Sequence, residues 1–296
     1  MIGFLILIIF LFGILLFKYR KSQIKDGLLL WSKVRSIDCI NNISSECDNL
    51  NVKISIPPVY NRPNKGFDKD AALYGMRAIF GFITSINNNS LLKIDNMSPP
   101  ILSYYANDNQ PITSTWYSGN VALVVIRGTR NINELKSDLK YSSVTTLDNY
   151  SVHKGMYSVY QNIKQQLFNS LSDSVTDVFI VGHSLGSAIS YYFGLDLSKK
   201  YNVEIMAFAP PRSGDRAFTN AVSNLRTTSI INIADFIPSL PWSFMPIMAN
   251  NPVEYSHVNP IYSFNNMQND IVSCHNLFAY YQGITLVIPS IIPDIL

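Results

Sequence analysis

A serine with a glycine two residues to either side has the setting in this chain that most favours chemistry. It lies in Gly182-His183-Ser184-Leu185-Gly186, a pattern that is common by chance when taken alone. Here the apolar run Val178–Val181 precedes it, and a helical segment follows. A sharp strand-to-helix turn would expose the hydroxyl of Ser184 at the carboxyl end of a sheet, and the helix N-terminus would add positive potential where an oxyanion forms. The pattern therefore predicts a nucleophilic serine; the alternative is a glycine-bounded turn with an incidental serine.

The elements that would position Ser184 alternate between strands and helices. Apolar runs predict buried strands at residues 121–126 and 178–181, and mostly apolar segments predict two more strands at 204–209 and 228–233. Apolar residues at helical spacing predict helices at residues 69–86, 155–171 and 187–199. This alternation implies βαβ units, so we expect an α/β fold with a mostly parallel central sheet and helices on both faces.

The N-terminus predicts a membrane anchor. Met1–Phe17 carries no charge, and as a helix it would span about 25 Å, the short end of what a bilayer core of roughly 30 Å requires. Lys18-Tyr19-Arg20-Lys21 stands where a signal peptide would have small residues before its cleavage site, which favours an uncleaved anchor over a cleaved signal. We expect a transmembrane anchor at residues 1–21, a polar lead-in at 22–65 and the α/β domain at 66–296. The basic flank places that domain in the cytosol, and a lumenal domain is the alternative.

Charge and cysteine content exclude several other classes of protein. Four of the 23 basic residues flank the anchor, which leaves 19 against 20 acidic residues, so no basic surface for nucleic acid is expected. The three cysteines do not have zinc-site spacing. Cys39 and Cys47 could form a disulfide or remain free thiols, and Cys274 is left over.

Five motifs, in order along the chain, resemble the class 3 lipase family, the fungal triacylglycerol lipase-like branch of the α/β hydrolases. The resemblance covers about residues 70–285 and implies an α/β-hydrolase fold, a Ser-His-Asp triad and a lipid ester substrate, with no metal or organic cofactor. The motifs are Val125-Ile126-Arg127-Gly128-Thr129, Val152-His153-Lys154-Gly155-Met156, Val181-Gly182-His183-Ser184-Leu185-Gly186, Phe208-Ala209-Pro210-Pro211-Arg212-Ser213-Gly214 and Asn232-Ile233-Ala234-Asp235-Phe236-Ile237-Pro238.

The acid and base that a serine nucleophile needs can be sought in the order Ser, acid, His that is typical of α/β hydrolases. Asp235 follows a predicted strand; it could merely cap the turn before Pro238, but the resemblance makes it the triad acid. Among the four histidines, only His257 and His275 follow Asp235. His275 is favoured because it begins a helical segment, as the family's catalytic histidine does, whereas His257 lies in a stretch typical of a packed histidine.

The oxyanion hole requires two hydrogen-bond donors. The turn geometry assigns one to the backbone N–H of Leu185, and the resemblance assigns the other to Thr129. Two features depart from the family pattern. Ser187 stands where the family usually has a glycine, so tighter packing between helix and strand is expected there. The segment Asn131–Leu139 resembles the family's lid but is unusually polar.

Together these features predict a membrane-anchored serine lipase that hydrolyses acylglycerol or phospholipid esters through an acyl-enzyme. The expected partners are the lipid ester and the membrane, the latter through residues 1–17, and the protein is expected to be a monomer. A catalytically silent lipase fold acting as a membrane interaction module, or an acyltransferase using the same triad, are the alternatives.

Overall fold

The computed structural model describes residues 67–87, 91–94, 97–104, 110–128, 142–241, 243, 253–268, 273–286 and 290–292. Several parts of the chain for which the sequence makes predictions lie outside these ranges: the anchor and lead-in, Cys39, Cys47, Thr129 and the lid-like segment 131–139. Within the described ranges, every helix is too short or too polar to span a bilayer.

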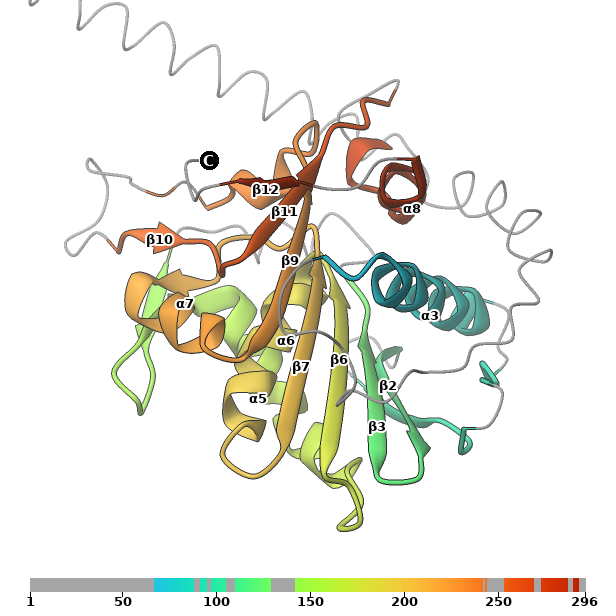
Figure 1. Cartoon of the computed structure of the whole chain (residues 1–296). Helices are drawn as coiled ribbons and strands as arrows, with labels where there is room; N and C mark the ends of the chain where they lie inside the picture. Colours follow the sequence, from blue (N-terminus) through green and yellow to red (C-terminus); the bar gives the residue numbers. More distant parts are fainter. Residues whose placement is uncertain are drawn as a thin grey trace, which may run out of the picture.

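An eight-stranded sheet forms the centre of the fold, with the strand order β1-β2-β3-β6-β7-β9-β11-β12. Five neighbouring strands are parallel, so their carboxyl ends all lie at the same end of the sheet (Figure 1). They are β3 (Val121–Ile126), β6 (Asp177–His183), β7 (Asn202–Phe208), β9 (Arg226–Asn232) and β11 (Ile261–Phe264). Antiparallel strands complete the two edges: β1 (Ile101–Tyr104) and β2 (Pro111–Ser118) on one side, and β12 (Ser290–Ile292) on the other. The expected mostly parallel sheet is confirmed.

Helices cover both faces of this sheet (Figure 1). One face packs against α3 (Lys69–Asn87) and α8 (Leu277–Leu286), and the other against α5 (Lys154–Asn169), α6 (Leu185–Leu197) and α7 (Arg216–Ser223). Successive side chains of a strand point to opposite faces, so β3 supplies Leu123 and Val125 to the α3 side, and Val124 and Ile126 to the α5 side. This two-sided burial explains why the strand is an unbroken apolar run.

A smaller antiparallel sheet, in the order β10-β8-β5-β4, lies beside α7. Its strands are only two or three residues long: β4 (Ser143–Thr145), β5 (Ser151–His153), β8 (Gly214–Asp215) and β10 (Tyr255–Ser256). His153 ends β5 and caps α5, because its Nδ1 accepts a hydrogen bond from the N–H of Met156 at 3.4 Å. His153 therefore has a structural role, as the N-cap of α5.

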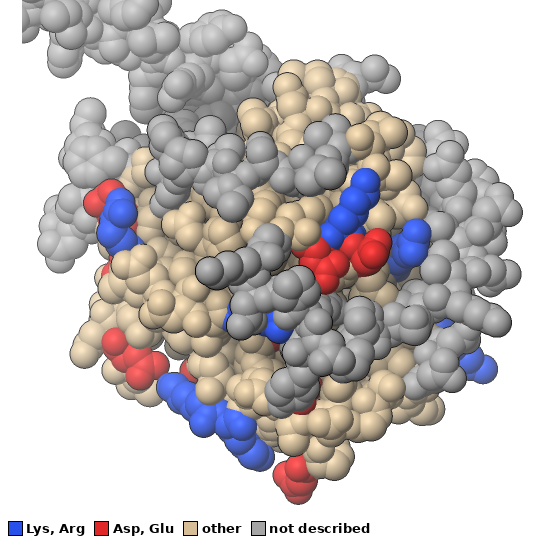
Figure 2. All heavy atoms as spheres, in the orientation of Figure 1, with Lys and Arg blue, Asp and Glu red and all other residues tan. Residues whose placement is uncertain are grey.

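Charged side chains on the described surface are sparse and mixed in sign. Figure 2 shows blue and red groups lying next to one another, with wide areas carrying neither. Lys199 approaches Asp148 at 3.3 Å, and Arg216 approaches Glu254 at 3.3 Å. Exposed pairs of this kind contribute about 0–1 kcal/mol each, so the stability of the fold depends mainly on its two apolar layers.

Candidate active site

Ser184 occupies a strained turn between β6 and α6. Its backbone has φ 56° and ψ −125°, in a region that non-glycine residues rarely adopt. A side chain on Gly182 would place Cβ 2.4 Å from the carbonyl oxygen of Gly186, and one on Gly186 would place Cβ 2.3 Å from the carbonyl oxygen of Ile126. The two glycines are therefore required by close backbone contacts, and Ser184 is held at the carboxyl end of β6.

Ser187 adds hydrogen bonds to this turn. Its buried hydroxyl lies 2.9 Å from the carbonyl oxygen of Gly182 and 2.7 Å from that of Phe208. The carbonyl of Phe208 also accepts the N–H of Ser184 at 2.9 Å. The serine that replaces the family's glycine thus ties the first turn of α6 to the ends of both β6 and β7.

Ser184, His275 and Asp235 form one hydrogen-bonded chain. The Nε2 atom of His275 lies 2.9 Å from the Oγ atom of Ser184, and its Nδ1 atom lies 2.7 Å from an Oδ2 oxygen of Asp235. All three residues are buried. A carboxylate accepts the proton of Nδ1, which leaves Nε2 free to accept the proton of the serine hydroxyl. The structure therefore brings together the three residues expected from the sequence, across 91 positions of the chain.

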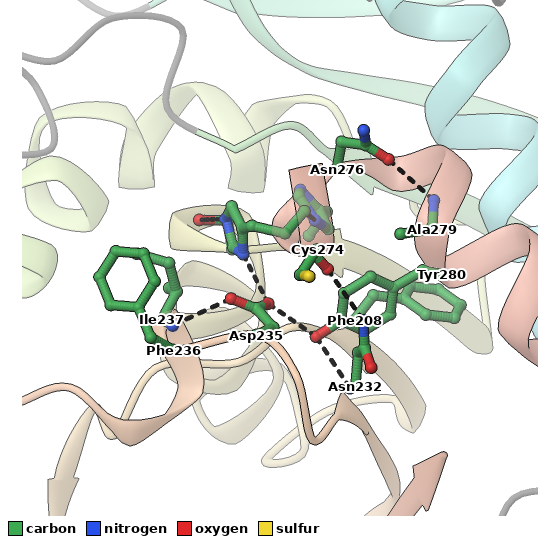
Figure 3. A network of polar contacts seen from close by, with 12 residues as sticks. Phe208, Asn232, Asp235, Phe236, Ile237, Cys274, Asn276, Ala279 and Tyr280 are labelled. Atoms are coloured by element: carbon green, nitrogen blue, oxygen red, sulfur yellow. Dashed lines mark hydrogen bonds and ion pairs between the residues drawn. The ribbon is translucent and has the colours of Figure 1, made fainter. Parts of the chain in front are cut away.

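The carboxylate of Asp235 is held by two further donors. The N–H of Ile237, in the 3-10 helix η2 (Ile237–Ser239), donates to Oδ1 at 2.9 Å. The hydroxyl of Tyr280, on α8, donates to Oδ2 at 2.8 Å (Figure 3). Burial raises the pKa of Tyr280 well above its ordinary value, and the nearby charge of Asp235 acts in the same direction. The hydroxyl is therefore protonated and able to donate at neutral pH.

His275 is placed by its own backbone as well as by its ring. It ends the 3-10 helix η3 (Ser273–His275), and Asn276 caps α8 by accepting the N–H of Ala279 at 2.8 Å. The Nε2 of His183 lies 3.0 Å from the carbonyl oxygen of His275 and donates to it, and the two rings lie 4.8 Å apart. Burial lowers the pKa of His183 well below its ordinary value, and proximity to His275 lowers it further. His183 is therefore a neutral donor that holds the backbone of His275.

His257 is not part of this chain of hydrogen bonds. It lies just after β10 and is buried. Burial lowers the pKa of His257 to about 3, and the charge of Arg212 lowers it further. Arg212 in turn donates to the carbonyl oxygen of Pro241 at 3.1 Å. His257 is thus a neutral packed histidine, as expected.

The residues of the predicted oxyanion hole are described in part. Leu185 is the first residue of α6, where a backbone N–H has no intrahelical acceptor. Gly128 packs against the turn, because a Cβ there would lie 3.0 Å from that of Ser184. Arg127 is buried and donates to the carbonyl oxygen of Gly128 at 2.9 Å. Thr129, the next residue, lies outside the described ranges.

Sequence reasoning missed Tyr280 and Asn232, which support the acid and the base. Tyr280 is fully buried, and it carries no signal in the sequence, because α8 also contains Tyr281, Gln282 and Thr285. Asn232 ends β9 and is discussed below. Among the described residues, no group of three His, Cys, Asp or Glu side chains could hold a metal ion.

A mostly parallel sheet with helices on both faces, a strained serine turn after a central strand, and an acid and a histidine later in the chain define an α/β-hydrolase fold. Comparison with known proteins gives the family. Residues 123–245 match the model of class 3 lipases. The lipase of Rhizomucor miehei is 27% identical over 149 residues, which cover 45% of this chain and 41% of that protein. Both matches support the class 3 lipase family, so the resemblance expected from the motifs is confirmed.

A second relative and a solved structure are also similar to this chain. Secreted mono- and diacylglycerol lipase A of Penicillium cyclopium is 24% identical over 174 residues, covering 54% of this chain and 53% of that protein. The chain thus spans about half or less of the length of these curated relatives. A structure of the Rhizomucor miehei lipase propeptide complex superposes with a TM-score of 0.54 at 20% identity, covering 72% of each chain. At this identity the superposition bears on the fold alone.

Proposed function

We propose that this protein is a serine-dependent carboxylic ester hydrolase that acts on lipid esters. One observation carries the proposal: the hydrogen-bonded chain from the Oγ of Ser184 through His275 to Asp235, with distances of 2.9 and 2.7 Å. A serine, an imidazole and a buried carboxylate in this order are the groups needed to activate a hydroxyl at neutral pH.

The proposed reaction has two halves. His275 accepts the proton of Ser184 as Oγ attacks the ester carbonyl carbon, and the N–H groups of Leu185 and Thr129 stabilise the oxyanion of the tetrahedral intermediate. The imidazolium then gives its proton to the leaving alkoxide, which departs as an alcohol and leaves an acyl-serine. In the second half, water gives a proton to His275 as it attacks the acyl carbon. The imidazolium then returns a proton to the departing Oγ of Ser184, which frees the serine and releases the carboxylic acid. Asp235 keeps the imidazole in the required tautomer throughout.

Lipid esters are the substrate class that the relatives favour. Their names include lipase, mono- and diacylglycerol lipase, and phospholipase A1. The predicted membrane anchor in residues 1–21 would keep the domain at a bilayer, where acylglycerols and phospholipids are concentrated. The proposal therefore includes an anchored monomer with its domain in the cytosol.

Covalent labelling tests the proposed nucleophile. A fluorophosphonate probe is expected to label the wild-type protein and the control variant Ser198→Ala, in which a serine at the far end of α6 is removed. Ser184→Ala is expected to lose all labelling while it stays folded. Absence of labelling in the wild-type protein would reject the hydrolase and leave the silent membrane module.

A separate experiment tests the anchor. Full-length protein is expected in the membrane fraction after carbonate washing, and a variant without residues 1–21 in the supernatant. Treatment with a glycosidase should leave the mobility of the full-length protein unchanged, because sequons at Asn42, Asn88 and Asn149 are modified only in the lumen. A mobility shift would reverse the proposed orientation.

A further inference from the structure

Asn232 connects three segments at the carboxyl end of β9. Its amide nitrogen Nδ2 donates to the carbonyl oxygens of Asn266 at 2.9 Å and Cys274 at 3.1 Å. Its amide oxygen Oδ1 accepts the N–H groups of Asn266 at 2.9 Å and Ala234 at 3.3 Å. A primary amide has two donor hydrogens and two acceptor lone pairs, so this fully buried side chain uses its whole capacity.

The partners of Asn232 are the backbone groups next to the acid and the base. The carbonyl of Cys274 belongs to the peptide bond that leads into His275, and the N–H of Ala234 lies one residue before Asp235. These two segments are 40 residues apart in the sequence, and Asn232 bonds to both. Figure 3 shows the bond between Asn232 and Cys274.

The backbone of Asn232 provides a second connection to the acid. Its N–H donates to the hydroxyl oxygen of Tyr280 at 3.1 Å, and that hydroxyl donates to Oδ2 of Asp235. The same Oδ2 accepts the proton of His275. Asn232 is therefore connected to the acid–base pair in two ways, through the neighbouring backbone and through Tyr280. It makes no direct hydrogen bond to the side chain of His275 or Asp235.

From this geometry we infer that Asn232 is a positioning residue that sets the separation of His275 and Asp235, an inference that rests on the proposed function. It has no contact with the nucleophile and takes no part in bond making. It acts by locking the turn that bears the acid to the turn that bears the base. A misplacement of about 1 Å between catalytic groups can cost on the order of 100-fold in rate.

Two substitutions of Asn232 test this role. Asn232→Asp keeps the shape but turns a carboxylate oxygen toward two carbonyl oxygens, and Asn232→Ala removes all four bonds. Both are expected to lower kcat on a soluble p-nitrophenyl ester about 100-fold, with KM changed less than threefold. The control is Asn266→Ala, which removes bonds to Ala279 and Gln268 but leaves the backbone groups of Asn266 bonded to Asn232. It is expected to lose stability with kcat within threefold of wild type.

A proton NMR readout separates positioning from general stability. The Nδ1 proton shared by His275 and Asp235 should give a strongly deshielded resonance in the wild-type protein and in Asn266→Ala. The resonance should be lost or shifted upfield by at least 1 ppm in Asn232→Ala. This variant introduces no repulsive group, so it can still be measured if Asn232→Asp does not fold. An unchanged resonance, or a fall in kcat no larger than that of Asn266→Ala, would overturn the inference. Failure of the proposed function would instead appear as an absence of probe labelling in a wild-type protein that retains the resonance.

Discussion

Replacing Gly186 with alanine should lower both the activity and the stability of the protein. The added Cβ would lie 2.3 Å from the carbonyl oxygen of Ile126 and 2.7 Å from that of Arg127, at the carboxyl end of β3. Both are backbone atoms, so relief to an ordinary contact of 3.4 Å requires a shift of roughly 1 Å between β3 and α6. Overpacking of this size typically costs about 1–3 kcal/mol of unfolding free energy.

The same shift would separate the two sides of the proposed oxyanion hole. Leu185 moves with α6, whereas Gly128 continues from β3. Because a displacement of about 1 Å can cost on the order of 100-fold in rate, Gly186→Ala should lower kcat/KM about 100-fold. Steady-state kinetics on a soluble ester, together with urea unfolding, would measure both effects.

Gly194, on the same helix, provides a matched control. A Cβ there would lie 2.5 Å from the Cδ1 atom of Ile205, the far end of a flexible side chain that can rotate away. Alanine also favours the helix by up to about 1 kcal/mol over glycine. Gly194→Ala should therefore keep its unfolding free energy within about 1 kcal/mol of wild type and its kcat/KM within twofold. The reasoning fails if a folded Gly186→Ala protein keeps a third of the wild-type kcat/KM, or if Gly194→Ala loses as much activity.

Three further predictions concern side chains around the same site. Tyr280→Phe removes a hydrogen bond to a carboxylate, worth about 1.5–3 kcal/mol. Urea unfolding should therefore show a loss of stability of about that size, and an unchanged free energy of unfolding would contradict this role of the hydroxyl. The pKa of His257 is about 3 in the folded protein, below its ordinary 6.5, so the unfolded chain takes up this proton first as pH falls below 6.5. When the pH is lowered from 7.5 to 5, the wild-type protein should therefore lose about 2 kcal/mol more unfolding free energy than His257→Gln, as measured by urea unfolding. Equal losses would show that His257 is not a buried neutral histidine. Ser187→Ala should unfold with about 1–2 kcal/mol less free energy and no change in KM, and an unchanged urea midpoint would refute the role of its hydroxyl.

The parts of the fold that the sequence predicted are those with strong local patterns. Strands buried on both faces are usually apolar along their length, so four of the five parallel strands were predicted, and β3 is an unbroken apolar run. The fifth, β11, was not predicted, because it has only four residues and two of them are Tyr262 and Ser263. The antiparallel β2 was not predicted, because it buries Thr113, Ser114 and Thr115. The two- and three-residue strands of the smaller sheet carry no periodicity at all. They form because tertiary packing brings them together.

In the candidate site, too, the residues in local motifs could be predicted and those that depend on tertiary packing could not. The serine turn is a local motif, and the order of acid and base along the chain narrowed the choice to named residues. The support from Tyr280 and Asn232 depends on how α8 and the loop before it approach the end of β9, which no local pattern specifies. The hydrogen bonds of Ser187 could not be predicted from the sequence either, because a small residue at that position indicated only tighter packing.

The backbone of Ser184 also bears on how this protein would respond to selection for stability. A non-glycine residue at φ 56° and ψ −125° carries strain of about 1–3 kcal/mol, and glycine would relieve it at the expense of the nucleophile. Random mutagenesis screened only for thermal resistance should therefore enrich Ser184→Gly, a more robust but inactive protein. Directed evolution of this scaffold needs an activity selection at every round, because a strained position is also the one on which the proposed reaction depends.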